Sequence, residues 1–117
     1  MSGVLLSTMT QSVGRSLTSV EFVRDYIQFR FDGHCLTTVT LPVLKLPEEI
    51  LRPTDEGYRE ALCSQIGALL QGVDLSEEEL TVRFANSVVI IISLRPEDYT
   101  GPEAIHYVTE NGTWIVA

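Results

Sequence analysis

The stretch ELTVRFANSVVIIISL, residues 79–94, decides the fold, because its second arm is the most hydrophobic run in the chain. In its first arm Leu80, Val82 and Phe84 alternate with polar residues, which is the period of a strand with one buried face. The second arm, residues 88–94, is apolar on one face and partly apolar on the other, as is typical of an interior strand covered on both sides. The stretch therefore predicts a β-hairpin at the centre of the core.

The length of the loop between the two arms decides which side chains face each other. A three-residue loop at Ala85-Asn86-Ser87 places Val82 opposite Ile90 on the apolar face. A two-residue loop would place Arg83 opposite Ile90 instead. Because a slip of one residue would turn the apolar face outward, burial favours the three-residue loop.

Further strands are expected before this hairpin. Residues 20–31 alternate like a strand but change phase at Arg24-Asp25, which predicts a bulge or a short turn there. Asp32-Gly33 is a strong hairpin signal. It leads into a return strand that is expected within residues 35–46.

On the return strand, the spacing predicts the direction of some side chains and leaves that of His34 open. Cys35, Val39 and Leu41 are expected to face the core, with Thr37 on the same side. Two-residue and three-residue loops place His34 on different faces, and the spacing leaves both open. Pro42 cannot donate a ladder hydrogen bond, so the strand lies at a sheet edge or ends there.

One main helix is predicted after these strands. Thr54 or Asp55 is a suitable N-cap, and the helix is expected to run to about Gln71. Gly72 is then a natural C-terminal stop, while Gly67 inside the helix costs about 1 kcal/mol relative to Ala. Helical spacing is followed by Tyr58, Leu62, Ile66, Leu69 and Val73.

The two ends of the chain complete the pattern. Apolar residues at four-residue spacing in residues 1–18 predict a short helix, docked on the body or on a second subunit, or else a loose tail. Residues 104–108 and 113–116 are expected to form a last hairpin. The chain is therefore expected to be a single α+β domain over residues 19–117, preceded by the extension of residues 1–18. This domain is a mainly antiparallel β-sheet with one main α-helix packed on it.

Composition limits the classes of function. The chain has 117 residues, of which 44% are hydrophobic, and a net charge of −8, which suits one globular domain. No cationic face for phosphates is visible, so neither nucleic acid nor a membrane is expected as a partner. The sequence has no apolar run of roughly 20 residues and no signal-peptide pattern, so a cytoplasmic protein is expected. A basic partner protein suits this charge, although such charge can also serve only solubility.

Residues that commonly carry chemistry are few. His34, Cys35, Cys63 and His106 lack the spacing of metal ligands, so no metal is expected. The two cysteines are interpreted as buried free thiols. Phosphate-binding loops, nucleophile elbows and dinucleotide fingerprints are absent from the sequence. No cofactor and no catalytic residue is therefore predicted.

Two polar segments supply the candidate binding residues. One is a loop stiffened by two prolines after the most buried strand, and loops on a rigid scaffold often hold binding sites. The other is an acidic turn before the central hairpin. The candidates are Arg95, Glu97, Asp98, Tyr99 and Glu103 in the loop, and Glu77, Glu78 and Glu79 in the turn. The competing interpretation is structural, with Arg95 paired to a carboxylate and Tyr99 at the core edge.

Two segments of the sequence, FVRDYIQFRFDG and LRPEDYTGPEA, resemble those of a group of small bacterial α+β proteins of unknown function. The similarity covers about residues 19–108. Neither segment is a catalytic motif, so the resemblance assigns no functional residue. In size and acidity the chain is also similar to the immunity proteins of bacterial toxin systems.

We therefore expect a non-enzymatic bacterial protein that binds another macromolecule, with a basic toxin domain as one such partner. The alternative is a small-molecule binder or minor enzyme that uses the loop from Arg95 to Glu103. A third hypothesis is a homodimer whose N-terminal segment crosses to its partner. Acidic residues at both ends of the predicted helix are expected to bracket one negative surface.

Overall fold

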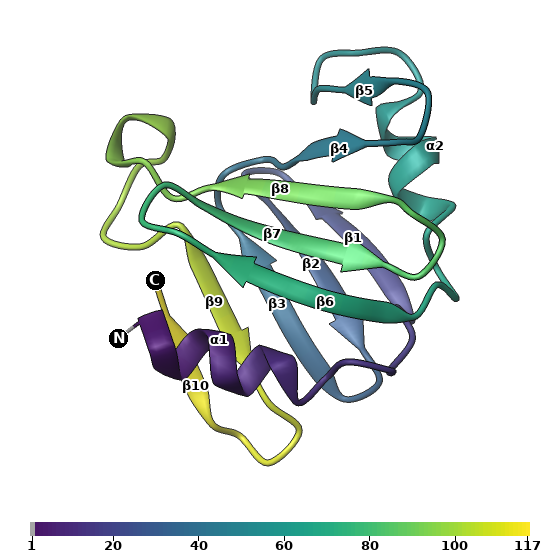
Figure 1. Ribbon diagram of the computed structural model, residues 1–117. Helices are drawn as coiled ribbons and strands as arrows, with labels where there is room; N and C mark the ends of the chain where they lie inside the picture. The colour runs from purple at the N-terminus through teal and green to yellow at the C-terminus, as the bar shows by residue number, and fades with distance from the viewer. Residues whose placement is uncertain (1) are drawn as a thin grey trace.

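Two antiparallel five-stranded sheets pack face to face, and their strands cross at a steep angle (Figure 1). The structure, a computed structural model, describes residues 2–117, with side chains from Val4 onward. The first sheet contains, in spatial order, β1 (Ser19–Val23), β2 (Tyr26–Phe31), β3 (His34–Thr38), β9 (Ile105–Val108) and β10 (Trp114–Val116). The second contains β5 (Ile50–Leu51), β4 (Val43–Lys45), β8 (Val89–Ser93), β7 (Glu79–Phe84) and β6 (Leu70–Leu75). The helices are α1 (Ser2–Thr10), α2 (Tyr58–Cys63) and the 3-10 turn η1 (Pro96–Asp98).

The predicted class, a mainly antiparallel α+β domain, is confirmed. The division of the strands between two sheets was not foreseen. The chain passes from the first sheet to the second after β3, and it returns to the first through η1. Within the described residues 2–117, no helix is long and apolar enough to cross a membrane.

The central hairpin is formed by β7 and β8 in the predicted register. Val82 lies opposite Ile90, and the amide of Phe84 donates to the carbonyl of Val88 at 2.9 Å across the three-residue loop. Strand β8 is an interior strand between β4 and β7, as expected. Its second face, however, is only half-buried at Val89 and Ile91, so the expectation that both faces are covered was wrong.

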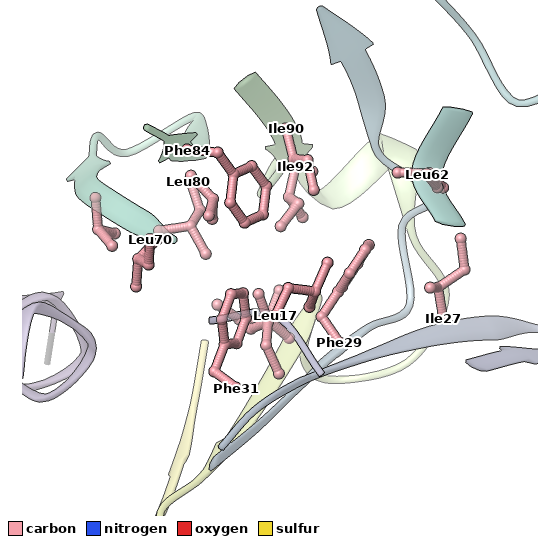
Figure 2. Close-up of a cluster of buried hydrophobic side chains, with 14 of the residues drawn as sticks. Leu17, Ile27, Phe29, Phe31, Leu62, Leu70, Leu80, Phe84, Ile90 and Ile92 are labelled. Carbon is pink, nitrogen blue, oxygen red and sulfur yellow. The ribbon is translucent and has the colours of Figure 1, made fainter. Parts of the chain in front are cut away.

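The core lies between the two sheets. Figure 2 shows Phe29 and Phe31 of the first sheet directed toward Phe84, Ile90 and Ile92 of the second. All five side chains are at most 2% exposed. Apolar burial between two faces is the main force that holds such sheets together, at about 25 cal/mol per Å².

The hairpins of the first sheet decide which residues face this core. The predicted short turn at Arg24-Asp25 joins β1 to β2. The Asp32-Gly33 loop has two residues, with φ of 44° and 98°, and sets Phe31 opposite His34. His34 therefore points inward. Cys35 lies on the outer, half-buried face, so its expected core position was wrong by one residue.

The predicted long helix is a six-residue helix instead. Helix α2 ends at Cys63, and Gly67 adopts a φ of 98°, a left-handed conformation outside any helix. Ile66 and Leu69, expected on the buried stripe, are 47% and 48% exposed. The chain then enters β6, where Leu70 and Val73 are buried beside β7. Pairing with β7 outweighs the helical spacing of residues 58–73.

The two α-helices cover the open sides of the sandwich. Helix α1 packs against β6 and β10 and buries Leu5 and Met9 (Figure 1). Helix α2 packs against β1 and β4 on the other side. The Tyr58 hydroxyl donates to the carbonyl of Pro42 at 2.5 Å, and burial raises the pKa of this phenol.

The last predicted hairpin is present as β9 and β10. Val108 lies opposite Trp114, and Tyr107 lies opposite Ile115. Trp114 is 65% exposed at the sheet edge.

Candidate functional site

The acidic turn and the polar loop lie side by side in space. Glu79 at the start of β7 pairs with Ser93 at the end of β8, and the amide of Leu94 donates to the carbonyl of Glu78 at 2.8 Å. The turn is fixed by Ser76, whose Oγ accepts from the amides of Glu78 and Glu79 at 3.2 and 3.1 Å. Because β8 leads directly into η1, the central hairpin brings both candidate segments to one end of the molecule.

Polar contacts link these two segments. A guanidinium nitrogen of Arg95 lies 3.3 Å from the Glu78 carboxylate. Ser93 donates through its hydroxyl to Asp98 at 2.5 Å and accepts from the amide of Arg95 at 3.2 Å. The predicted pairing of Arg95 with a carboxylate is confirmed, and its partner is itself a candidate binding residue. Both side chains are more than half exposed, so the pair contributes at most about 1 kcal/mol to stability.

Two hollows open beside this ion pair. A hollow of about 220 Å³ is lined by Leu41, Val43, Glu78, Glu79, Ile91, Ser93, Arg95 and Asp98. A second, of about 530 Å³, is lined by Arg24, Asp25, Val39, Leu41, Glu97, Asp98, Tyr99 and Thr100. Leu41 and Asp98 line both hollows, and Leu41 is 43% exposed between them, so its expected core position was wrong. We call the acidic turn, the loop of residues 95–103 and Leu41 together the acidic end.

Negative charge predominates around these hollows. Five carboxylates and two guanidiniums line them: Asp25, Glu78, Glu79, Glu97 and Asp98 against Arg24 and Arg95. An apolar side chain ringed by carboxylates is complementary to a surface that carries lysine or arginine around an apolar group.

The remaining candidates take other positions. Glu77 is exposed but lines neither hollow. Tyr99 packs half-buried against the core and lines the larger hollow, as the structural interpretation expected. Glu103 is directed to His106, with a carboxylate oxygen 3.8 Å from Nε2. Helix α2 lies at the end of the second sheet away from the β6–β7 turn (Figure 1), so the acidic segments beside α2 and the acidic turn do not bracket one surface, as was expected.

The cysteines and histidines do not gather. Within residues 2–117, no group of three or more His, Cys, Asp or Glu side chains is placed to hold a metal ion. Cys35 and Cys63 are both free. Cys63 is exposed, which contradicts its interpretation as a buried thiol, and the buried residues of α2 are Tyr58 and Leu62.

Sequence reasoning missed a third hollow, of about 270 Å³, at the other end of β2. Eight residues from three segments line it: Thr8, Gln11, Arg15, His34, Thr109, Glu110, Asn111 and Thr113. No motif joins these segments in the sequence. The only signal was the Asp32-Gly33 loop, because its length decides that His34 points inward.

Comparisons of the chain with protein-family models, with curated proteins and with solved structures found no match. Function is therefore inferred from the geometry of these sites alone.

Proposed function

We propose that this protein is a non-enzymatic binding module whose acidic end docks a basic partner protein. The observation that carries the proposal is the convergence of the acidic turn and the polar loop on two hollows that share Leu41. Apolar side chains in such a position commonly act as interface anchors, while surrounding charges select the partner and speed its encounter.

Charge supports the same assignment. The whole chain carries −8, and the hollows of the acidic end are lined by more carboxylates than guanidiniums. Exposed carboxylates contribute little to folding and repel one another. A cationic partner relieves this repulsion on binding, as expected for an immunity-like protein that binds a basic toxin domain. Two free cysteines suit a cytoplasmic protein, because thiols stay reduced there.

The test compares two triple variants of equal charge. Glu77→Gln/Glu78→Gln/Glu79→Gln removes three charges at the acidic end, and Glu48→Gln/Glu49→Gln/Glu56→Gln removes three exposed charges elsewhere. A basic partner is first isolated by affinity capture on the wild-type protein, and its association rate is measured at low and high salt. The first variant should associate markedly more slowly at low salt and lose most of the salt dependence, whereas the second should stay close to wild type.

Leu41→Asp tests the apolar anchor. It should weaken the same complex mainly by faster dissociation, because a buried contact is replaced by a charge. Equal association rates for both triple variants, together with unchanged dissociation of Leu41→Asp, would remove the acidic end from the interface.

The alternative function is a small-molecule site, or a minor enzyme, in the same loop. The hollow of about 530 Å³ beside Tyr99 favours it, because this volume lies in the range of ligand pockets. A small ligand that protects the protein against heat, and loses this effect in Tyr99→Ala but not in the Glu77–79 variant, would favour this alternative.

A further inference from the structure

The two sheets have four edge strands, β1 and β10 in the first sheet and β5 and β6 in the second. An edge strand presents unpaired backbone N–H and C=O groups, to which another strand can bind. Native proteins block such edges with charged side chains, prolines, short strands or a covering helix. A comparison of the four edges therefore shows which one is open to a further strand.

Three of the four edges are blocked. Strand β1 carries the ion-paired Glu21, and helix α2 packs against it. Strand β5 has only two residues, and residues 47–49 and 52–53 flank it with charges and prolines. Strand β6 is covered by α1 and by the segment before β1, where the amide of Gly14 donates to the carbonyl of Leu70 at 2.8 Å. Each of these edges thus has at least one blocking feature.

Strand β10 has no such blocking residue. Trp114, Ile115 and Val116 are all apolar, and the neighbouring Thr113 and Ala117 are uncharged. The side chains of Trp114 and Val116 point to the outer face of the sheet and are exposed. Helix α1 contacts β10, but within residues 2–117 it makes no hydrogen bond with this strand. Among the described strands, β10 is therefore the open edge.

The backbone groups of β10 that face away from β9 belong to Trp114 and Val116. The amide of Ala117 donates to the carbonyl of Ile105 at 3.1 Å, and the amide of Ile105 donates back at 3.0 Å. Such bonded positions alternate along an antiparallel pair, so Trp114 and Val116 direct their N–H and C=O groups outward. Within the described part of the chain, no hydrogen bond is made by these four groups.

These four groups are arranged symmetrically about Ile115. A second β10 can run antiparallel to the first, with the two Ile115 residues opposite each other. Trp114 then lies opposite the partner's Val116, and Val116 lies opposite the partner's Trp114. Each of these two pairs exchanges two backbone hydrogen bonds. A second copy of this chain is therefore complementary to the edge, because one two-fold axis pairs all four groups in both chains.

Charge and side-chain packing also favour a second copy at this edge. Two chains with a net charge of −8 repel each other, so they associate most easily where neither carries a charge. Residues 111–117 contain no acidic or basic side chain. A basic partner, in contrast, finds no carboxylate here to pair with. On the outer face Trp114 packs beside the partner's Val116, and such cross-strand pairs of aromatic and β-branched residues stabilise sheets.

We propose that the protein forms a symmetric homodimer through β10, in which the five strands of each first sheet join into one continuous sheet. The interface is small, of the transient class that buries less than about 1,200 Å², so the dimer dissociates on dilution. Strand β10 contributes no residue to the hollows of the acidic end. Dimerisation therefore uses a surface separate from the one proposed for the basic partner.

The test follows the full chain from about 1 µM to about 1 mM, the range of transient affinities. Sedimentation should change from monomer to dimer. Trp114 is the only tryptophan, so its fluorescence should shift to shorter wavelength over the same range, as the partner shields the indole from water. Hydrogen exchange should slow at the amides of Trp114 and Val116, which become bonded only in the dimer.

Two results of this experiment would overturn the proposal. One is a monomer at every concentration, whether or not a strand of another protein binds this edge. The other is a dimer in which the amides of Trp114 and Val116 still exchange as fast as in the monomer, because the copies would then meet at another surface.

Variants of Val116 separate dimerisation from folding. Val116→Pro removes one outward N–H from each chain, and proline is tolerated at an edge where the N–H faces solvent. Val116→Asp adds a charge to the edge, and Val23→Asp adds the same charge to β1, where Val23 is similarly exposed. The dissociation constant of the dimer should rise at least about tenfold in both Val116 variants and less than about twofold in Val23→Asp.

Urea unfolding at low concentration is the control for folding, and the midpoints of Val116→Asp and Val23→Asp should agree. If Val116→Pro does not fold, Val116→Asp still decides the matter. Wild-type dimerisation in Val116→Asp, or an equal loss of the dimer in Val23→Asp, would remove β10 from the interface and overturn the proposal.

Discussion

Phe31 in β2 and Phe84 in β7 stack across the two sheets, with ring centroids 6.2 Å apart and planes 20° apart. Each side chain is 1% exposed. Because the two rings belong to different sheets, their contact depends directly on sheet packing. Pairs of this geometry contribute about 0.5–1.5 kcal/mol beyond the burial of their area.

A double-mutant cycle measures this contact. Phe31→Leu and Phe84→Leu should each destabilise the protein, and the double variant should lose about 0.5–1.5 kcal/mol less than the sum of the two. Urea unfolding of the four proteins gives the coupling energy. Strict additivity would mean that the rings do not touch in solution.

The central hairpin provides a second test, with one residue on the buried face of the sheet and one on its outer face. Ile90→Ala should cost roughly 2–5 kcal/mol, because it leaves a cavity between the sheets. Thr81→Ala, on the outer face of β7, should cost less than about 1 kcal/mol. Equal urea midpoints for the two variants would show that the sheet faces are assigned the wrong way round.

Local patterns predicted the hairpins well. The alternation of Leu80, Val82 and Phe84 is a two-residue period over a short range, and burial of one face leaves only one register. Asp32-Gly33 likewise specifies its turn through two positive φ angles, 44° and 98°. Such features depend on neighbours in the sequence, so they could be predicted without the fold.

The helix and the sites depend on contacts that are distant in sequence. Residues 58–73 have a helical spacing of apolar residues, but Leu70 and Val73 are stabilised more by strand pairing with β7 than they would be in a helix. No local pattern in the sequence predicts this pairing. The hollow of about 270 Å³ combines residues 8–15, His34 and residues 109–113, and the last two segments come together because β3 pairs with β9. The acidic end could have been predicted from the sequence, because the hairpin register itself places Glu79 opposite Ser93.

Stability should depend on pH through the two buried tyrosines. Burial raises the pKa of both Tyr58 and Tyr107, so the unfolded chain loses these protons first, near the usual value of about 10. Their contribution is therefore complete below about pH 10 and is lost as the pH rises toward the folded pKa. Tyr58→Phe should cost about 0.5–1.5 kcal/mol at neutral pH, through its bond to Pro42, and this deficit should shrink above pH 10. A constant deficit in urea unfolding across this range would contradict the assignment.

Thiol reactivity should distinguish the two cysteines. Cys63 is exposed on α2, whereas Cys35 is half-buried on the outer face of β3. A thiol reagent added to the folded protein should therefore modify Cys63 first and Cys35 more slowly. Cys63→Ser should remove the fast phase and change stability by less than about 0.5 kcal/mol. A fast phase that persists in this variant would assign it to Cys35.

Gly72 tests the corrected path of the chain after α2, and Gly33 is the reference for a glycine in the left-handed conformation. Gly33 has a φ of 98°, and a Cβ there would also lie 3.1 Å from Glu110, so Gly33→Ala should cost about 1–2 kcal/mol or more. Gly72 lies within β6 outside the left-handed region, and its Cβ would meet only the flexible guanidinium of Arg83.

Gly72→Ala should therefore change the free energy of unfolding by less than about 1 kcal/mol, because the better strand propensity of Ala offsets the displacement of Arg83 from Asp74. If Gly72 instead ended a helix in a left-handed conformation, as the spacing of residues 58–73 indicates, this substitution would cost as much as Gly33→Ala. Urea unfolding of the two variants side by side decides between strand and helix at this position.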